Sequence, residues 1–260
     1  MLRIPAIAAL VLACLLALHA EALAEDARMV IWYPGEAGST AEAQPVLDAF
    51  FGYLSKDMAP EKVTGQYFNS VKGGLDYISH KKPKAGIISY AAWMQNRAKM
   101  GGAEVILSTL PLPGGRKTER YALVGGDDKL APDAKIYSSE PLSQGFIRQH
   151  LFANIPASAK LAQTDRMFVK LKALSSGSEK AYAILTPLEA STLKRIKSDW
   201  SKSLKVIERS KPVPTARVVV FDPGWEGKGK FSEALLGAGK DPEAEEILEE
   251  LRLKGFGSTN

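Results

Sequence analysis

The chain alternates between short apolar runs and longer segments that carry a helical apolar stripe, and this order limits the folds it can adopt. Apolar runs at residues 29–33, 62–68, 85–89 and 104–110 predict strands, and the segments between them predict helices. A strand that is followed by a helix and another strand usually returns parallel to the first, so the order predicts a mostly parallel sheet flanked by helices. Ligands bind beyond the carboxyl ends of the strands in such sheets. We therefore expect a site in the loops that follow these strands.

The pattern begins again after about residue 127, which predicts a second lobe. We expect residues 25–122 and 206–260 to form the first lobe and residues 123–205 to form the second. In this second half, strands are expected at 135–137, 167–173 and 218–221, and helices at 143–152, 178–185, 229–236 and 242–253.

Residues 1–24 have the pattern of a secretory signal peptide, with a basic start at Arg3 and an apolar run at residues 4–18. We expect cleavage after Ala24 and a periplasmic location. The alternative is a lipoprotein acylated at Cys14, which is less favoured because it would leave an apolar LLAL segment on the mature chain. No later stretch approaches the roughly 20 apolar residues of a membrane span.

Groups that would support catalysis or metal binding are few. The only cysteine is Cys14, so a chain cleaved after Ala24 has no thiol chemistry, disulfide or zinc–thiolate site. His80 and His150 stand in no Ser-His-Asp or HExxH pattern. The GEAGST loop after the first strand lacks the Lys-Ser/Thr ending of a P-loop. We expect no enzyme, no cofactor and no metal site.

The charge of the chain also bears on its partners. The formal net charge is +5, but the lysines are spread out and do not interleave with aromatic residues. We expect a monomer without a nucleic-acid partner. The mild basicity fits either an anionic small ligand or solubility alone.

Turns rich in Ser, Thr and Gly precede three of the expected helices, at residues 38–40, 143–145 and 175–178. Hydroxyl and backbone N–H donors at helix starts can bind an oxyanion, and three starts could converge on one ligand. The alternative for each single turn is an ordinary helix cap that binds no ligand. The candidate ligand-binding residues are Tyr33, Ser39, Thr40, Ser89, Tyr90, Ser143, Gln144, Gly145, Ser176, Ser178 and Glu179.

The C-terminal stretches LKVIERSKPVPTARVVVF and KFSEALLGAGKDPEAEEILEELRLKGF resemble those of the periplasmic solute-binding proteins of ABC transporters, in particular the phosphate, phosphite and phosphonate-binding group. AGIISYAAW and RYALVGGDD are similar to further segments of that family, and the resemblance covers nearly all of residues 28–256. It implies a type II periplasmic-binding fold of two α/β lobes, joined by two crossing strands that act as a hinge.

The resemblance is weaker at the ligand site. The family's Ser/Thr-x-Ser-Gly helix start falls on residues 141–145, where Gln144 replaces a small hydroxyl residue, and its Gly-Ser-His turn falls on residues 176–179, where Glu179 replaces histidine. A carboxylate there would repel a phosphate dianion and attract an amine. The resemblance thus implies an anionic or zwitterionic solute delivered to a membrane permease. The alternative is a ligand-sensing or scaffold protein of the same fold.

Overall fold

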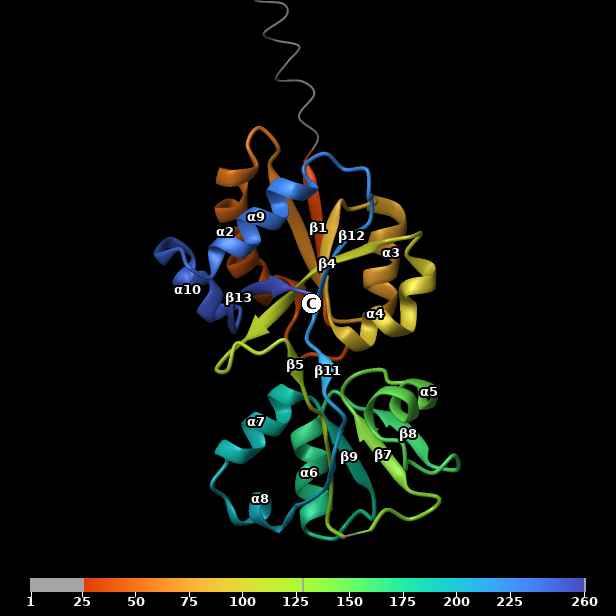
Figure 1. The fold of residues 1–260 in the computed structure, drawn as a ribbon. Helices are drawn as coiled ribbons and strands as arrows, with labels where there is room; N and C mark the ends of the chain where they lie inside the picture. The colour runs from red at the N-terminus through yellow and green to blue at the C-terminus, as the bar shows by residue number, and fades with distance from the viewer. Residues whose placement is uncertain (1–25, 128, 260) are drawn as a thin grey trace, which may run out of the picture.

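The computed structural model describes residues 26–127 and 129–259, which form two lobes, one above the other in Figure 1. The first lobe contains a six-stranded sheet in the order β13-β4-β12-β3-β1-β2, and the second contains a five-stranded sheet in the order β10-β6-β9-β7-β8. The predicted signal peptide, residues 1–24, lies outside the described residues. Among the residues described, no helix has the length and apolar character needed to cross a membrane.

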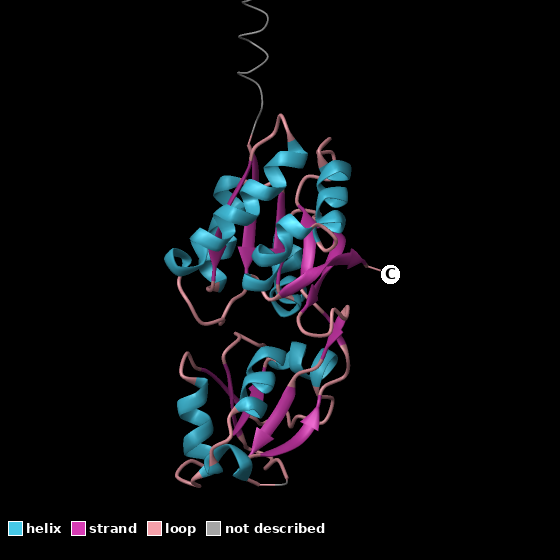
Figure 2. Ribbon diagram, turned by 90° about the vertical axis from the view of Figure 1, so that its left-hand side faces the viewer, coloured by secondary structure: helices cyan, strands magenta, loops and turns pink. Residues whose placement is uncertain are grey.

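In the first lobe, β1 pairs parallel with β2 and β3, whereas β12 runs antiparallel to β3 and β4. Helices cover both faces of this mixed sheet (Figure 2). The strands are β1 (Ala27–Trp32), β2 (Val63–Phe68), β3 (Ala85–Ile88), β4 (Glu104–Pro111), β12 (Arg217–Val220) and β13 (Leu253–Ser258), and the helices are α2 (Thr40–Met58), α3 (Val71–Lys81), α4 (Tyr90–Asn96), η1 (Arg97–Lys99), α9 (Lys228–Ala238) and α10 (Pro242–Glu250).

The second lobe repeats this arrangement on a smaller scale, with β7 parallel to both β8 and β9, and β6 antiparallel to β9. Its strands are β6 (Ala122–Gly125), β7 (Lys135–Ser138), β8 (Lys160–Gln163), β9 (Tyr182–Leu185) and β10 (Lys205–Arg209), and its helices are α5 (Gln144–Phe146), η2 (Ile147–Leu151), α6 (Met167–Ser175), α7 (Pro187–Arg195) and α8 (Asp199–Ser203).

Two chain passages connect the lobes, and they pair with each other as short antiparallel strands, β5 (Thr118–Glu119) and β11 (Val213–Pro214). These are the two crossing strands that the resemblance implied. The crossing lies a few residues away from the predicted divisions after residue 122 and before residue 206, because β6 and β10 pair with each other inside the second sheet.

Two sequence predictions in the second lobe were wrong. Residues 167–173 were expected to be a strand and form helix α6, whose buried Met167, Leu171 and Leu174 have helical spacing. Residues 178–185 were expected to be a helix, but they form a turn followed by strand β9. All four residues of β9 are buried, as in a central strand covered on both faces, so its sequence shows no alternation.

Candidate functional site

The loops that follow β1 and β7 bring the two lobes into close contact. A Cβ atom placed on Gly35, in the loop after β1, would lie 2.2 Å from the carbonyl oxygen of Ser139, which follows β7. Gly35 also has a left-handed backbone with φ of 88°. Only glycine combines this conformation with such a close approach.

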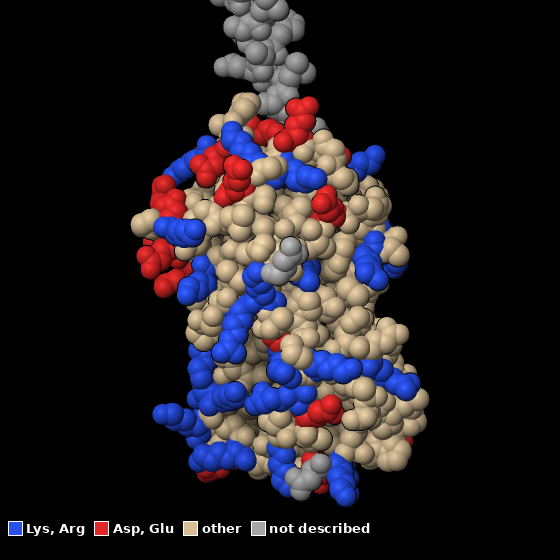
Figure 3. Space-filling view, in the orientation of Figure 1, with Lys and Arg blue, Asp and Glu red and all other residues tan. Residues whose placement is uncertain are grey.

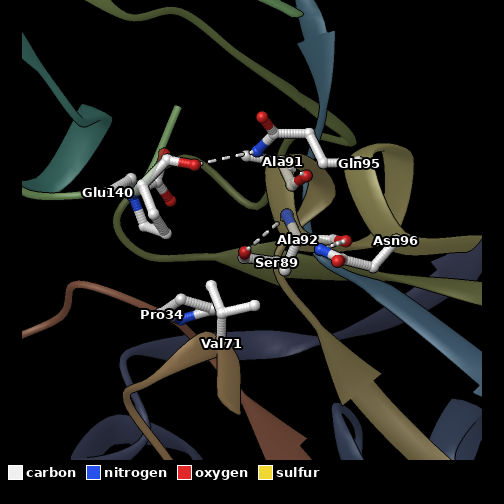
Figure 4. Close-up of a pocket in the computed structure, with 9 residues that line it drawn as sticks. Pro34, Val71, Ser89, Ala91, Ala92, Gln95, Asn96 and Glu140 are labelled. Atoms are coloured by element: carbon white, nitrogen blue, oxygen red, sulfur yellow. Dashed lines mark hydrogen bonds between the residues drawn. The ribbon is translucent and has the colours of Figure 1, made fainter. Parts of the chain in front are cut away.

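A cavity of about 150 Å³ lies beside this contact, between the lobes (Figure 4). Its first-lobe wall comes from the loop after β1, the start of α3 and the length of α4 with its cap Ser89, and its second-lobe wall comes from the segment after β7. The lining residues are Pro34, Val71, Ser89, Ala91, Ala92, Gln95, Asn96, Glu140 and Pro141. Apolar and amide groups dominate this wall, and Glu140 is the one lining residue that carries a carboxyl group.

Glu140 is buried, with 6% of its surface exposed, and its carboxylate accepts a 2.7 Å hydrogen bond from the Tyr121 hydroxyl. Burial raises the pKa of Glu140 to about 8, although the Tyr121 hydrogen bond acts in the opposite direction. The carboxylates of Glu119, Glu36 and Glu189 raise the pKa further. Glu140 therefore interacts electrostatically with three other acidic residues, and we call the four the cleft carboxyl cluster; Glu140 is the member that lines the cavity.

The other members of the cleft carboxyl cluster come from three different elements: the loop after β1 (Glu36), strand β5 (Glu119) and the first turn of α7 (Glu189). Burial raises the pKa of Glu119 to about 8, and the charge of Glu36 adds to this shift. Glu36 is exposed to solvent, and the protein atoms around it nevertheless raise its pKa to about 7 by desolvation, against a lowering effect of Arg252. Burial also raises the pKa of Glu189, which caps α7 through Thr186.

The cleft carboxyl cluster contrasts with the outer surface of the second lobe. In Figure 3 Lys and Arg side chains cover much of the visible face of that lobe. On this face the second lobe thus presents mainly cationic side chains, whereas the cavity wall contains the carboxyl group of Glu140. A positively charged group entering the cavity would restore the ionised form of this carboxyl group.

Sequence reasoning did not identify this cluster. Glu36 and Glu140 each lie a few residues beyond the end of a buried strand, where ligand-binding groups are expected in such sheets, and this position was the available signal. Glu119 and Glu189 join them only through the folding of distant segments.

Among the candidates from the first lobe, Ser89 and Tyr90 lie at the space between the lobes, whereas Tyr33 packs against the core of the first lobe. Ser89 lines the cavity and caps α4 by accepting a hydrogen bond from the N–H of Ala92. Burial raises the pKa of Tyr33 well above its usual range, and Glu36 and Glu119 add to this effect. Tyr90 packs against Phe146 of the second lobe.

Ser39 and Thr40 serve the start of α2. The Ser39 hydroxyl accepts from the N–H of Glu42, whose carboxylate accepts in return from the N–H of Ser39, so the two residues form a capping box. The Thr40 hydroxyl donates to the carbonyl oxygen of Tyr67. These polar groups are used within the first lobe.

At the turn of residues 143–145, the Ser143 hydroxyl, the Ser143 N–H and the Gln144 side chain are bonded to other groups of the protein. The Ser143 hydroxyl accepts from the N–H of Phe146, and the Ser143 N–H donates to Oε1 of Gln95 at 2.7 Å. The Gln144 amide donates to the carbonyl oxygen of Ala157, and Gly145 lies on the exposed surface. The expected helix at 143–152 is three α-helical residues followed by the π-helical segment η2.

The proposed third helix start, at residues 175–178, is corrected by the structure, because these residues follow the end of α6. The Ser176 and Ser178 hydroxyls donate to the carbonyl oxygen of Ala173. Since β8 runs parallel to β7 and α6 follows it, α6 begins near the cleft and ends on the opposite side of the lobe. Ser176, Ser178 and Glu179 therefore lie away from the cleft, and the structure contradicts their assignment as ligand-binding residues.

Glu179 has cationic partners in its own lobe. Its carboxylate accepts a hydrogen bond from the Tyr137 hydroxyl and lies 3.4 Å from the amino groups of both Lys135 and Lys170. The hydrogen bond from Tyr137 is the main cause that lowers the pKa of Glu179, and Lys170 adds to it. Glu179 is therefore not positioned to repel a phosphate dianion bound between the lobes.

Within residues 26–127 and 129–259, no group of three or more His, Cys, Asp or Glu side chains is arranged to hold a metal ion.

Comparison with known proteins gives similarity in structure without similarity in sequence. No family model matches the chain, and no curated protein matches its sequence. The alignment with a Xanthomonas citri protein bound to ATP covers 90% of this chain and 92% of the other, with 13% sequence identity and a TM-score of 0.70. The alignment with the binding-protein component of an ABC phosphonate transporter from Pseudomonas aeruginosa covers 90% of this chain and 82% of the other, with 14% sequence identity and a TM-score of 0.63. The alignment with an ancestral arginine-binding protein bound to arginine covers 86% of this chain and 97% of the other, with 15% sequence identity and a TM-score of 0.55.

These similarities define the fold as that of the two-lobed type II periplasmic binding proteins, which confirms the fold expected from the sequence. The likeness includes phosphonate-binding proteins, as the sequence resemblance implied, and extends to proteins whose ligands have different chemistry.

Proposed function

We propose that the protein is a solute-binding protein of an ABC-type uptake system, which holds a small solute between its two lobes. The observation that carries the proposal is the cavity of about 150 Å³ whose walls come from both lobes of a hinged fold. A ligand that contacts both walls binds the closed form better than the open form, so binding and closure are coupled.

We further propose that the solute carries a positive charge, as a zwitterion does. Sequence reasoning left anionic and zwitterionic solutes open. The cleft carboxyl cluster supports the zwitterion, because an amine near Glu140 would gain a charge-assisted hydrogen bond and remove the mutual repulsion of the carboxylates. A phosphate dianion would add to that repulsion.

The size of the cavity also supports a small solute. A volume of about 150 Å³ corresponds to roughly five water molecules at their liquid volume. Small amino acids and aminosulfonates have molecular volumes of this order.

The partners and the location follow the sequence predictions. We propose delivery of the solute to a membrane permease and a periplasmic location after cleavage at Ala24. The alternative is a ligand-sensing or scaffold protein of the same fold. If the purified protein captures an ABC permease from membrane extracts, the transport function is supported; if it captures a membrane sensor, the alternative is supported.

The test is the shift in melting temperature of the purified protein with millimolar solutes. We expect stabilisation by β-alanine or taurine, which are zwitterions, and none by inorganic phosphate, methylphosphonate or sulfate. Stabilisation by the anions alone would refute the charge assignment and keep the solute-binding function. If no member of a broad panel of zwitterions, anions and cationic amines shifts the melting temperature, the solute-binding function itself is refuted.

A further inference from the structure

One side chain of the first lobe, Gln95 of α4, makes hydrogen bonds to the second lobe with both ends of its amide. Its Oε1 atom accepts from the backbone N–H of Ser143 at 2.7 Å, and its Nε2 atom donates to the carbonyl oxygen of Pro141 at 3.3 Å. Nε2 also donates to the carbonyl oxygen of Ala91, one turn back in α4, at 3.2 Å. Figure 4 shows Gln95 at the edge of the cavity, directed toward the segment that contains Glu140.

Tyr90, at the start of the same helix, adds an aromatic contact between the lobes. Its ring centroid lies 6.1 Å from that of Phe146 and 6.0 Å from that of His150, both on the α5–η2 segment. On the side of the first lobe, the guanidinium carbon of Arg217 lies 5.9 Å from the Tyr90 ring. Contacts of these two kinds each contribute modestly to stability.

All of these contacts are made by the protein's own groups, so they act on closure whether or not a solute is bound. They also oppose a cost of closure. The cleft carboxyl cluster takes Glu36 and Glu119 from the first lobe and the hinge, and Glu140 and Glu189 from the second lobe. Closure brings these groups together, so they either repel one another as carboxylates or must take up protons. A closed form therefore needs favourable contacts across the lobes.

We infer that Gln95 and Tyr90 form a latch that stabilises the closed form of the ligand-free protein. This inference goes beyond the proposed function, because it concerns the equilibrium between open and closed forms before any solute binds. The latch sets the fraction of protein that is already closed, and this fraction scales the apparent affinity for every solute that the closed form accepts.

The position of Gln95 suits this role. The side-chain amide holds an acceptor, Oε1, and a donor group, Nε2, in a fixed geometry. The acceptor matches the backbone N–H of Ser143, and the donor matches the carbonyl oxygen of Pro141. In the open form water would replace these bonds, so their net effect is modest. Loss of both interlobe bonds should lower the ratio of closed to open protein by about tenfold.

The experiment measures the distance between the lobes in the absence of added solute. Spin labels are placed on Lys72→Cys in α3 and Lys202→Cys in α8 of a protein that begins at Glu25 and so has no other cysteine, and the distance distribution is recorded by pulsed electron paramagnetic resonance. Both sites are exposed, with 88% and 68% of the side-chain surface accessible. Small-angle X-ray scattering of the unlabelled protein gives an independent radius of gyration.

The variant is Gln95→Met, which keeps the length and helix propensity of the side chain and removes both polar ends. Its control is Gln149→Met on the exposed face of η2. We expect one dominant short distance in the parent and in Gln149→Met, and a second, longer distance in Gln95→Met.

Two outcomes would overturn the latch: a parent protein that is mostly open without solute, or a Gln95→Met protein with the same distance distribution as the parent. Neither depends on which solute binds, or on whether any does. The latch and the proposed function can therefore fail separately.

Discussion

Glu140 and Glu179 are glutamates of the same lobe, and both accept a hydrogen bond from a tyrosine hydroxyl. Their surroundings differ in one respect. Glu179 has Lys135 and Lys170 beside it, and its pKa is lowered, whereas the charges that act on Glu140 are those of other carboxylates, and its pKa is raised to about 8. The lobe thus provides cationic partners for Glu179, the outer carboxylate. Glu140, the inner carboxylate at the cavity, can be neutralised only by a proton or by a cation that enters with a solute.

The largest expected effect is on solute affinity. Glu140→Gln keeps the size of the side chain and an acceptor for Tyr121, and it removes the charge that would pair with an amine. Because hydrogen bonds to charged groups contribute about 1.5–3 kcal/mol, we expect affinity for β-alanine or taurine to fall by about tenfold or more. Isothermal titration calorimetry measures the change.

The matched control for this variant is Glu179→Gln, which changes the same group on the far side of the lobe. Its affinity should stay within about twofold of the parent. Equal losses in the two variants would contradict the contrast between the inner and the outer carboxylate.

The next effect is on the pH dependence of stability. Glu119 and Glu140 have a pKa of about 8 in the folded protein, compared with an ordinary value of 4.5. Between about pH 5 and pH 8 the folded protein therefore binds more protons than the unfolded chain, and the free energy of unfolding should fall as the pH rises through this window. Urea unfolding at pH 5, 6.5 and 8 tests this.

Glu140→Gln should flatten this pH dependence, and Glu233→Gln, on the exposed surface of α9, should leave it unchanged. A free energy of unfolding that rises with pH across the window in the parent protein would contradict the account.

A third effect concerns the contact between the lobes at Gly35. Gly35→Ala would place a Cβ atom 2.2 Å from the carbonyl oxygen of Ser139, so the lobes must move apart. Gly38→Ala is its control, because Gly38 also has positive φ, 101°, but its Cβ atom would meet nothing closer than the Glu42 carboxylate at 3.8 Å. Both variants should lose about 1–2 kcal/mol of stability from the backbone conformation.

Small-angle scattering separates the two glycines. The radius of gyration of the ligand-free protein should increase in Gly35→Ala and stay at the parent value in Gly38→Ala. An unchanged radius in Gly35→Ala would mean that the lobes do not meet at this point in solution.

The smallest effect is the loss of stability in Glu179→Gln. Its carboxylate retains 26% exposure of the side chain, so solvent screens its pairs with Lys135 and Lys170. We expect a loss of about 1 kcal/mol or less, restricted to pH values above the lowered pKa of Glu179, since the paired form is ionised. Thermal unfolding at pH 7 and pH 3 measures it.

Much of the fold followed from the sequence because the first lobe has well-separated patterns. β1, α2, β2, α3, β3, α4 and β4 lie within a few residues of the predicted segments, since buried strands and amphipathic helices alternate there with clear turns. In the second lobe the short apolar stretches at α6 and β9 were assigned in reverse. A run of about eight residues has too few turns of helix for periodicity alone to separate the two.

The site was less accessible to sequence reasoning. The rule that ligands bind beyond strand ends pointed to Tyr33, Ser89 and Tyr90, of which Ser89 and Tyr90 lie at the space between the lobes. The helix caps at Ser39 and Ser143 were interpreted through their local chemistry, and their hydroxyls accept from backbone N–H groups of their own helix starts. The cleft carboxyl cluster joins positions 36, 119, 140 and 189, and only the tertiary fold brings them together.

The most direct test of the central claim is the number of protons exchanged when a zwitterion binds. Titration calorimetry of the protein with β-alanine or taurine at pH 7.5, in HEPES and in Tris, gives this number from the difference in heats. An amine that binds the cleft carboxyl cluster lowers the pKa of Glu140 and its neighbours, so we predict net release of protons and tighter binding at pH 8 than at pH 6. Net uptake of protons, with binding that weakens as the pH rises, would contradict a cleft built for a positive charge.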